Sequence, residues 1–310
     1  MKFLTDYTLV EFPKLGWKFD VYENLVEFTI PGWDIDITIK FYGVIIALGF
    51  TLAVLFGGRM AYKWKLSLDK MLDVLIYGTI GGIVGARLYY VAFEWDSYKN
   101  DLLSIFKIWE GGLAIYGGII GALIVAFFVC KKIDLNFYKL LDLAGMSFLI
   151  GQGIGRWGNF TNQEAFGTNT TLPWGMTSDK IADYITANYG TFVQNGIQMD
   201  AEQPVHPTFL YESLWCLLGF IILFIVCQKF RKFDGQLILG YGIIYGLERA
   251  VVEGLRTDSL YIGSTNLRVS QVLSMVLVVC CTALTIAKFV QIQKEKEQKV
   301  KEYKEKKGSV

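Results

Sequence analysis

The stretch FYGVIIALGFTLAVLFGG at residues 41–58 carries no charged side chain in eighteen positions. A helix of about 20 mostly apolar residues crosses the hydrocarbon core of a bilayer, because it satisfies its own backbone polar groups. This stretch therefore predicts a transmembrane helix. A second stretch, TFLYESLWCLLGFIILFIVC at residues 208–227, has the same character around one acidic side chain, Glu212.

Five further segments satisfy the same criterion, so the predicted fold is an all-α, polytopic membrane protein with about seven spans. The predicted spans are residues 40–59, 71–93, 111–130, 137–155, 208–228, 236–254 and 268–290. The composition agrees, because 53% of the residues are hydrophobic and only 19% are charged, below the roughly 25% typical of soluble domains. The fourth span is the least apolar, and we expect it to pack against protein rather than lipid.

Lysine and arginine in the short loops predict the orientation in the membrane, since cytoplasmic loops carry an excess of both. The loops after the first, third and fifth predicted spans are basic, and so is the C-terminal tail. Their basic residues are Arg59, Lys63, Lys65, Lys70, Lys131, Lys132, Lys139, Lys229, Arg231, Lys232 and the lysines from Lys288 to Lys307. We therefore expect an external N-terminus and a cytoplasmic C-terminus.

The same pattern divides the chain into three parts. Residues 1–39 are predicted to be an external segment; they hold several acidic side chains and no long apolar core, unlike a signal peptide. Residues 40–290 form the transmembrane domain, with a small external head at about 160–207. Residues 291–310 form a charged cytoplasmic tail, which we expect to lie near anionic lipid headgroups.

Cysteine and histidine limit the chemistry. The five cysteines lie within or beside apolar runs without a CxxC spacing, which is typical of small buried side chains rather than of disulfides or zinc ligands. With one histidine, a multi-histidine metal site is excluded, and we expect neither a metal nor another cofactor. The net charge of +1 gives no reason to expect a nucleic acid as a partner.

Glycines recur at the GxxxG spacing that lets two helix backbones approach closely. The pairs are Gly78 and Gly82, Gly81 and Gly85, Gly117 and Gly121, and Gly242 and Gly246. Helix packing is the interpretation we favour, and a path for a lipid or peptide between helices is the alternative.

Ionisable residues at membrane depth are costly and usually functional. They occur as Arg87 in GGIVGARLYY, in GRWGNFTNQEAFG at 155–167, and in YGLERAVVEGLR at 245–256. The second motif supplies Arg156, Asn159, Asn162 and Glu164. In all three places they lie toward the predicted external end of a span.

In the third motif, helical spacing places Tyr245, Arg249, Glu253 and Arg256 along one side of a helix. An intramembrane ladder of ion pairs is one interpretation. A site for a phosphate group is the other, because arginine binds phosphate through a planar fork and several arginines exceed what pairing needs. The anion we expect is a phospholipid headgroup in the external leaflet.

His206 precedes Pro207, directly before the fifth predicted span. It could cap that helix or hydrogen-bond locally. It could also act as a general base, since its unperturbed pKa is about 6.5.

These motifs resemble the prolipoprotein diacylglyceryl transferase family, of which GRWGNFTNQEAFG is similar to the signature. GGLAIYGG at 111–118, HPTFLYE at 206–212 and YGLERAVVEGLR follow the family order, and the resemblance runs from about residue 40 to about 290. It implies transfer of the diacylglyceryl group of phosphatidylglycerol to the lipobox cysteine of a secreted prolipoprotein, with formation of a thioether and release of glycerol phosphate.

The resemblance also implies a set of site residues. Arg156 and Asn159 would belong to the headgroup site, with Glu164 and Gly167 shaping it. Asn162 and Arg87, which stand out above as polar residues at membrane depth rather than by the resemblance, are further candidates for lipid binding. Tyr245, Arg249, Glu253 and Arg256 would line a facing wall, and Tyr42 would lie near the lipid.

The chain departs from the family where Tyr116 stands in place of a histidine that many members carry and that is a favoured candidate base. The proton acceptor here could be Tyr116, with an unperturbed pKa of about 10, or His206. Alternatively, the arginines could lower the pKa of the substrate thiol, so that no strong base is needed.

Two other function classes compete with a transferase. A phospholipid transporter or flippase could use the same arginines as an anion pathway, although inverted repeats and paired broken helices, frequent in transporters, are not evident. A membrane scaffold could use the polar helices as interaction faces. The length of the signature favours the transferase.

Overall fold

The computed structural model describes residues 2–30, 35–257 and 267–308. The chain forms two compact units, one of Met1–Leu55 with Gly145–Val310 and the other of Phe56–Ala144. We call them the main unit and the hairpin unit and describe each by itself.

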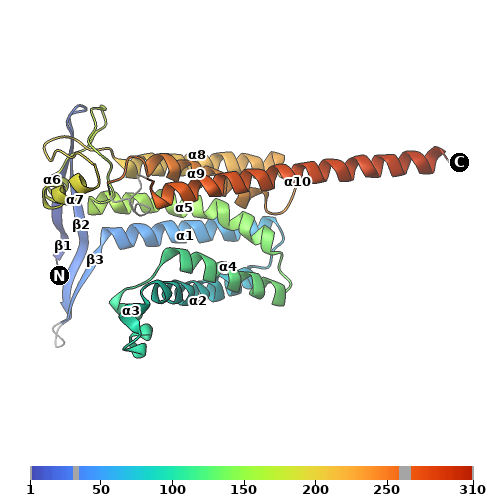
Figure 1. Cartoon of the computed structure of the whole chain (residues 1–310), viewed down its shortest axis with the longest axis horizontal. Helices are drawn as coiled ribbons and strands as arrows, with labels where there is room; N and C mark the ends of the chain where they lie inside the picture. Colours follow the sequence, from blue (N-terminus) through green and yellow to red (C-terminus); the bar gives the residue numbers. More distant parts are fainter. Residues whose placement is uncertain (1, 31–34, 258–266, 309–310) are drawn as a thin grey trace. The chain divides into compact units, whose positions relative to one another are not determined.

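Seven long helices occupy the seven predicted positions (Figure 1). They are α1 (Phe41–Lys63), α2 (Leu68–Phe93), α4 (Ile115–Lys132), α5 (Phe137–Asn162), α8 (Thr208–Ile225), α9 (Gln236–Val252) and α10 (Val269–Gly308). Among the described residues, α1, α2, α4, α8 with its continuation Val226–Phe230, and α10 are long and apolar enough to cross a membrane. That supports five of the predicted spans, and the polar side chains of α5 and α9 set those two helices apart.

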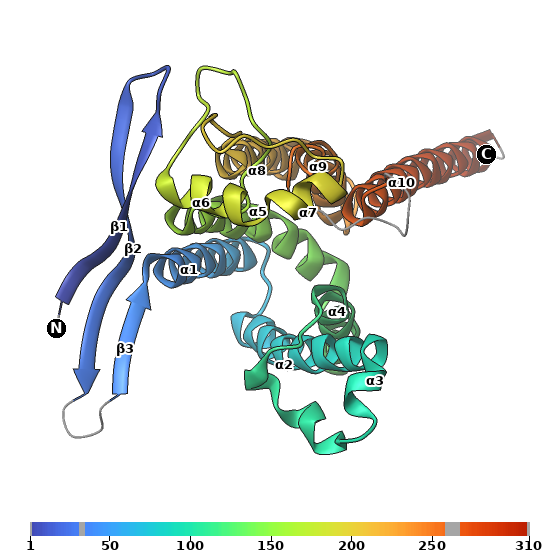
Figure 2. The same ribbon diagram turned by 60° about the vertical axis from the view of Figure 1, so that its left-hand side comes forward.

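An N-terminal sheet corrects the all-α prediction (Figure 2). Strands β1 (Lys2–Phe12), β2 (Trp17–Ile30) and β3 (Ile35–Lys40) pair antiparallel in that order, with Val10 opposite Phe19 and Thr29 opposite Asp36. The physical reason is the high content of β-branched and aromatic residues, which favours strands. These strands interleave apolar with charged side chains, so a search for long apolar runs does not detect them.

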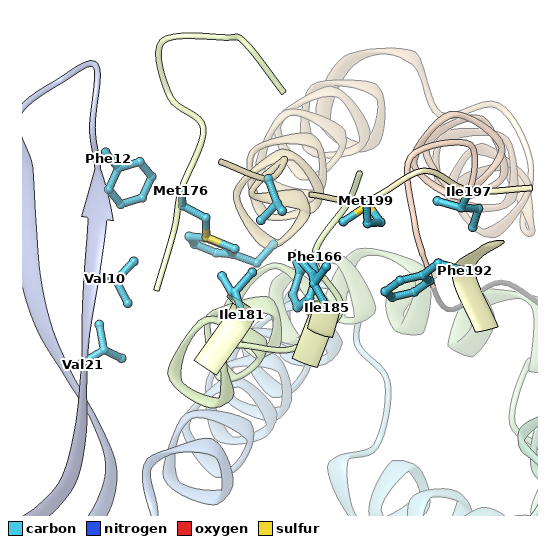
Figure 3. Close-up of a cluster of buried hydrophobic side chains, with 12 residues drawn as sticks. Val10, Phe12, Val21, Phe166, Met176, Ile181, Ile185, Phe192, Ile197 and Met199 are labelled. Atoms are coloured by element: carbon cyan, nitrogen blue, oxygen red, sulfur yellow. The ribbon is translucent and has the colours of Figure 1, made fainter. Parts of the chain in front are cut away.

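The segment after α5 packs against this sheet through a shared apolar core (Figure 3). It contains the short helices α6 (Asp179–Ala187) and α7 (Tyr189–Gln194). Their Ile181, Ile185 and Phe192 are buried together with Val10 and Val21 of the strands. Backbone hydrogen bonds between Glu11 and Thr177, both 2.9 Å, join β1 to the same segment. The strands and this segment therefore fold as one body.

In the hairpin unit, glycines bring α2 and α4 into backbone contact. A Cβ atom added to Gly85 would lie 2.4 Å from the Gly117 carbonyl oxygen, and one added to Gly121 would lie 2.4 Å from that of Gly81. The packing interpretation of these GxxxG pairs is confirmed. Between these helices lie the short α3 (Trp95–Tyr98), η1 (Leu102–Phe106) and η2 (Ile108–Glu110).

In the main unit, α5 packs against three other helices. A Cβ atom on Gly49 of α1 would lie 3.1 Å from the Gly151 carbonyl oxygen, one on Gly153 would lie 3.1 Å from Cys216 of α8, and one on Gly145 would lie 3.2 Å from Tyr241 of α9. Met146 and Leu149 of α5 are fully buried. The expectation that the least apolar span packs against protein is confirmed.

The helices α9 and α10 also meet at a glycine, since a Cβ atom on Gly246 would lie 2.9 Å from the Ser274 carbonyl oxygen. From there α10 continues as one helix through the lysine-rich tail, and in Figure 1 its C-terminal part extends past the other helices of the main unit.

Candidate active site

Three helix ends bring the charged residues of the main unit together. Arg156 lies near the C-terminal end of α5, Glu212 in the second turn of α8, and Arg249 near the C-terminal end of α9. Because α5 and α9 run opposite to α8, these positions fall at the same end of the helices. This end is the one next to the N-terminal sheet.

Glu212 is the centre of the cluster. Its side chain is 1% exposed, and its Oε2 atom forms an ion pair with Nη2 of Arg156. Its Oε1 atom lies 3.8 Å from Nη1 of Arg256. A buried carboxylate needs such partners, because an unpaired charge out of water is costly. Glu212 therefore holds two guanidinium groups in one small volume.

A second ion pair adjoins the first. Nη2 of Arg249 lies 2.7 Å from Oε2 of Glu253, whose side chain is 2% exposed. Glu248, also buried, lies within electrostatic reach of Glu212, Arg156 and Arg249. The contact between Arg249 and Glu253 confirms that part of the predicted stripe along α9. This geometry is compatible with both interpretations, the ladder of ion pairs and the phosphate site.

Glu212 and Glu248 were not among the predicted site residues. Both stand out in the sequence as acidic side chains in predicted spans, Glu212 alone among apolar residues and Glu248 directly before Arg249. That signal marks a buried charge that needs a partner. It does not say which arginine supplies the partner, because the pairing depends on how α5, α8 and α9 pack.

Beside the ion pairs lies a cavity of about 600 Å³, and most of the residues that line it are polar or charged. Four predicted residues line it, namely Asn159, Asn162, Glu164 and Arg256. Nδ2 of Asn159 donates to Oε1 of Glu164 at 2.9 Å, so the amide and the carboxylate hold each other at the end of α5. These four predicted residues are brought together around one space, whereas Arg156 and Gly167 are not among the residues that line it.

Gly167 lies where two backbone segments cross. Its N–H donates to the His206 carbonyl at 3.0 Å, and a Cβ atom added there would lie 2.8 Å from the His206 Cβ atom and 3.1 Å from the Leu255 carbonyl oxygen. No other residue would fit without a shift of these atoms. Gly167 thereby joins the segment after α5 to the approach of α8 and to the end of α9.

His206 takes part in a hydrogen-bond chain with two aromatic residues. Nε1 of Trp174 lies 2.7 Å from the Tyr211 hydroxyl, and that hydroxyl lies 3.0 Å from Nδ1 of His206. Indole N–H groups only donate, so the Tyr211 oxygen accepts from Trp174. In the Tyr211–His206 contact, the ring tautomer decides whether the hydroxyl or Nδ1 donates. Burial lowers the pKa of His206, which favours the neutral ring.

Two tyrosines complete the main-unit set. Tyr42, at the start of α1, packs on Gly158 of α5, where a Cβ atom would lie 2.8 Å from Cδ2 of the ring. Tyr245 stacks on Tyr241 with the ring centroids 5.8 Å apart, and Arg249 and Glu248 lie within electrostatic reach of its hydroxyl.

Arg87 and Tyr116 belong to the hairpin unit. Arg87 donates to the carbonyls of Ser104 (2.7 Å), Ile105 (2.7 Å), Gly111 (2.7 Å) and Gly112 (2.9 Å), so its guanidinium ties the loop before α4 to α2. Tyr116 lies in the first turn of α4 and is 42% exposed. A lipid-binding role of Arg87 and a base role of Tyr116 stay predictions.

Fold and site together define an integral membrane protein of the helical class, with buried arginine–carboxylate pairs at one end of its helices and a polar cavity beside them. Residues 32–287 match the model of the prolipoprotein diacylglyceryl transferase family. The chain belongs to this family, which makes it a bacterial membrane protein.

Curated relatives carry the same description. A phosphatidylglycerol--prolipoprotein diacylglyceryl transferase of Finegoldia magna is 44% identical over 273 residues, covering 88% of this chain and 99% of the relative. Proteins of that name from Listeria monocytogenes (45% identical; 81% of this chain and 86% of the relative) and Enterococcus faecalis (40%; 84% and 93%) are also similar.

Proposed function

We propose that this chain transfers the diacylglyceryl group of phosphatidylglycerol to the cysteine thiol of a prolipoprotein. The thiolate sulfur attacks the carbon of the diacylglyceryl group that is bonded to the phosphate ester oxygen. A carbon–sulfur bond forms, the carbon–oxygen bond to phosphate breaks, and glycerol phosphate leaves. Family membership and the names of the relatives support the reaction and both substrates. The main observation in support of an active site here is the group of arginines around Glu212.

The main catalytic requirement of this reaction is stabilisation of the charge that grows on the leaving phosphate. Preorganised donors in a water-poor site are the usual means. Arg156 and Arg249 are held by buried carboxylates, Glu212 and Glu253, which fix the orientation of each guanidinium before substrate arrives. Asn159, Asn162 and Glu164 supply hydrogen-bonding groups for the glycerol part in the adjoining cavity, and Gly167 and Arg256 shape it.

The thiol must lose its proton before it attacks, and the arginine cluster assists this deprotonation. A cationic environment lowers the pKa of a thiol and raises its thiolate fraction. Burial lowers the pKa of His206, which weakens its imidazole as a proton acceptor. We therefore favour thiolate stabilisation by the arginines, with Tyr116 as the remaining side-chain candidate.

We further propose that the sheet, the residue 160–207 head and the arginine cluster lie on the external side of the membrane. The cluster occupies the sheet end of α5, α8 and α9, whereas Lys229, Arg231 and Lys232 follow the opposite end of α8. The positive-inside rule places that basic end in the cytoplasm, together with the α10 tail. α5 and α9 then complete seven spans.

An assay in detergent micelles tests the reaction. Purified protein is mixed with phosphatidylglycerol and a synthetic lipobox peptide, and the peptide is analysed by mass spectrometry. A diacylglyceryl mass gain, absent when the peptide cysteine is replaced by serine, is the expected result. Folded protein that moves labelled lipid between leaflets of vesicles without a covalent product would contradict the proposal.

A further inference from the structure

One residue that lines the polar cavity beside the arginine cluster lies outside the family match, and its ion-pair partner also lines the cavity. Glu23 of β2 lines it, and so does Lys180 of α6. Glu23 precedes residue 32, where the family match begins. Oε2 of Glu23 lies 2.8 Å from Nζ of Lys180, and Oε1 lies 2.8 Å from Nζ of Lys40. The N-terminal sheet thus places one carboxylate between two lysines at the cavity.

Both ends of this contact are held in place by the fold. β1 is hydrogen-bonded to Thr177, and β2 pairs with β1 along its length. α6 is capped by Ser178, whose hydroxyl accepts from the Ile181 N–H at 3.2 Å, and buries Ile181 and Ile185 in the core shared with the strands. The Lys180 side chain is 42% exposed, so its ammonium group can exchange Glu23 for an incoming anion.

The cavity presents complementary groups for a small phosphorylated polyol. Lys180 and Arg256 are cations on different elements. Oδ1 of Asn162 is buried and has no hydrogen-bond partner among the described residues, so a hydroxyl group could donate to it. The hydrogen bonds from Lys180 and, second, from Lys40 lower the pKa of Glu23, which keeps that carboxylate charged and able to compete for the ammonium group.

We propose that this cavity is a product subsite, in which Lys180 binds the phosphate monoester of released glycerol phosphate and Glu23 competes for the same ammonium group. This inference rests on the proposed function. It identifies Lys180 as the group that binds the glycerol phosphate released by that reaction. A lysine ammonium suits a phosphate monoester as a point charge. The monoester carries more negative charge than the diester of the lipid, so Lys180 favours product over substrate. Exchange of the product for Glu23 then returns Lys180 to its ion pair.

The test is product inhibition of the full-length protein in micelles by added glycerol phosphate. Lys180→Gln is expected to raise the inhibition constant about tenfold, the worth of one charge-assisted contact. Lys180→Arg should restore most of the affinity for glycerol phosphate. Glu23→Gln should lower the inhibition constant, because the competing carboxylate is gone. Lys18→Gln is the matched control. Like Lys180, Lys18 pairs with a glutamate of the sheet, in its case Glu11 at 2.5 Å, but it does not line the cavity.

The KM for phosphatidylglycerol separates product from lipid headgroup. An unchanged KM with a raised inhibition constant is expected for Lys180→Gln. A KM that rises by the same factor would assign Lys180 to the lipid headgroup and overturn the product subsite, as would an unchanged inhibition constant in an active, folded variant. A wild-type protein that makes no lipidated peptide would instead overturn the proposed function itself.

Discussion

Glu212 links the two arginines that approach it from α5 and from the end of α9. We expect loss of this side chain to have the largest effect on stability, because removing one partner of a buried pair leaves an uncompensated charge. We expect Glu212→Leu to lower the free energy of unfolding by about 3 kcal/mol and to abolish transfer. Thermal unfolding in detergent measures the first effect. Glu11→Leu, which removes the partner of the exposed Lys18, is the control and should change stability by less than about 1 kcal/mol.

His206 permits a prediction with a pH dependence. Burial lowers its pKa in the folded protein, so the unfolded chain binds the proton more readily. The contribution of the neutral ring to stability is complete above about pH 6.5 and is lost as the pH falls through the lower folded value. We expect the decline of the melting temperature on acidification to be shallower in His206→Gln than in the wild type.

Catalysis gives the second readout for the same variant. His206→Gln should keep its transfer rate within a few-fold and its pH–rate profile unchanged, because one ring nitrogen of His206 is engaged with Tyr211 and burial lowers the pKa of the ring. Loss of the acid limb of that profile, where protonation of a base slows the reaction, would identify His206 as the base after all.

At the scale of elements, the glycine contacts hold α2 against α4. Gly85→Ala should destabilise the protein, because the added Cβ atom would lie 2.4 Å from the Gly117 carbonyl oxygen, a backbone atom that cannot rotate away. Gly43→Ala in α1 is the matched control, since a Cβ atom there meets nothing within 4 Å. Alanine favours helix over glycine by about 1 kcal/mol, so the control should be neutral or stabilising. Equal melting temperatures for the two variants would contradict this packing.

The elements also show what the sequence could and could not predict. Apolar length was enough for α1, α2, α4, α8 and α10, and the polar residues of α5 pointed correctly to packing within protein. The N-terminal strands were missed because charged residues such as Lys18 and Glu27 interrupt their apolar ones. The Glu23–Lys180 pair spans 157 residues of sequence, and only the docking of the sheet on α6 brings it together.

The site shows the same division. Arg249 and Glu253 are four residues apart on one helix, so their contact followed from spacing alone. Glu212 pairs with residues of two other segments, and its partners depend on helix packing. The His206–Tyr211 contact is a local hydrogen bond of the kind that the sequence allowed. The Trp174–Tyr211 contact joins the head to α8 and had no local signal.

At the scale of the whole molecule, the proposed orientation predicts which side of the membrane each end of the bundle faces. In a cysteine-free background, Tyr189→Cys in α7 should react with a membrane-impermeant thiol reagent added to intact cells, because Tyr189 is exposed in the head. Lys299→Cys in α10 should react only after the membrane is opened. The reverse pattern would invert the topology and place the arginine cluster on the cytoplasmic side.

The central claim is that arginines held by buried carboxylates stabilise the phosphate that leaves. The most direct measurement is the kcat of Arg156→Lys in the peptide lipidation assay. This variant keeps the charge opposite Glu212, and so its folding, but loses the planar fork. The account predicts a kcat reduced by about 100-fold with a melting temperature close to that of the wild type. A kcat like that of the wild type in the folded variant would contradict it.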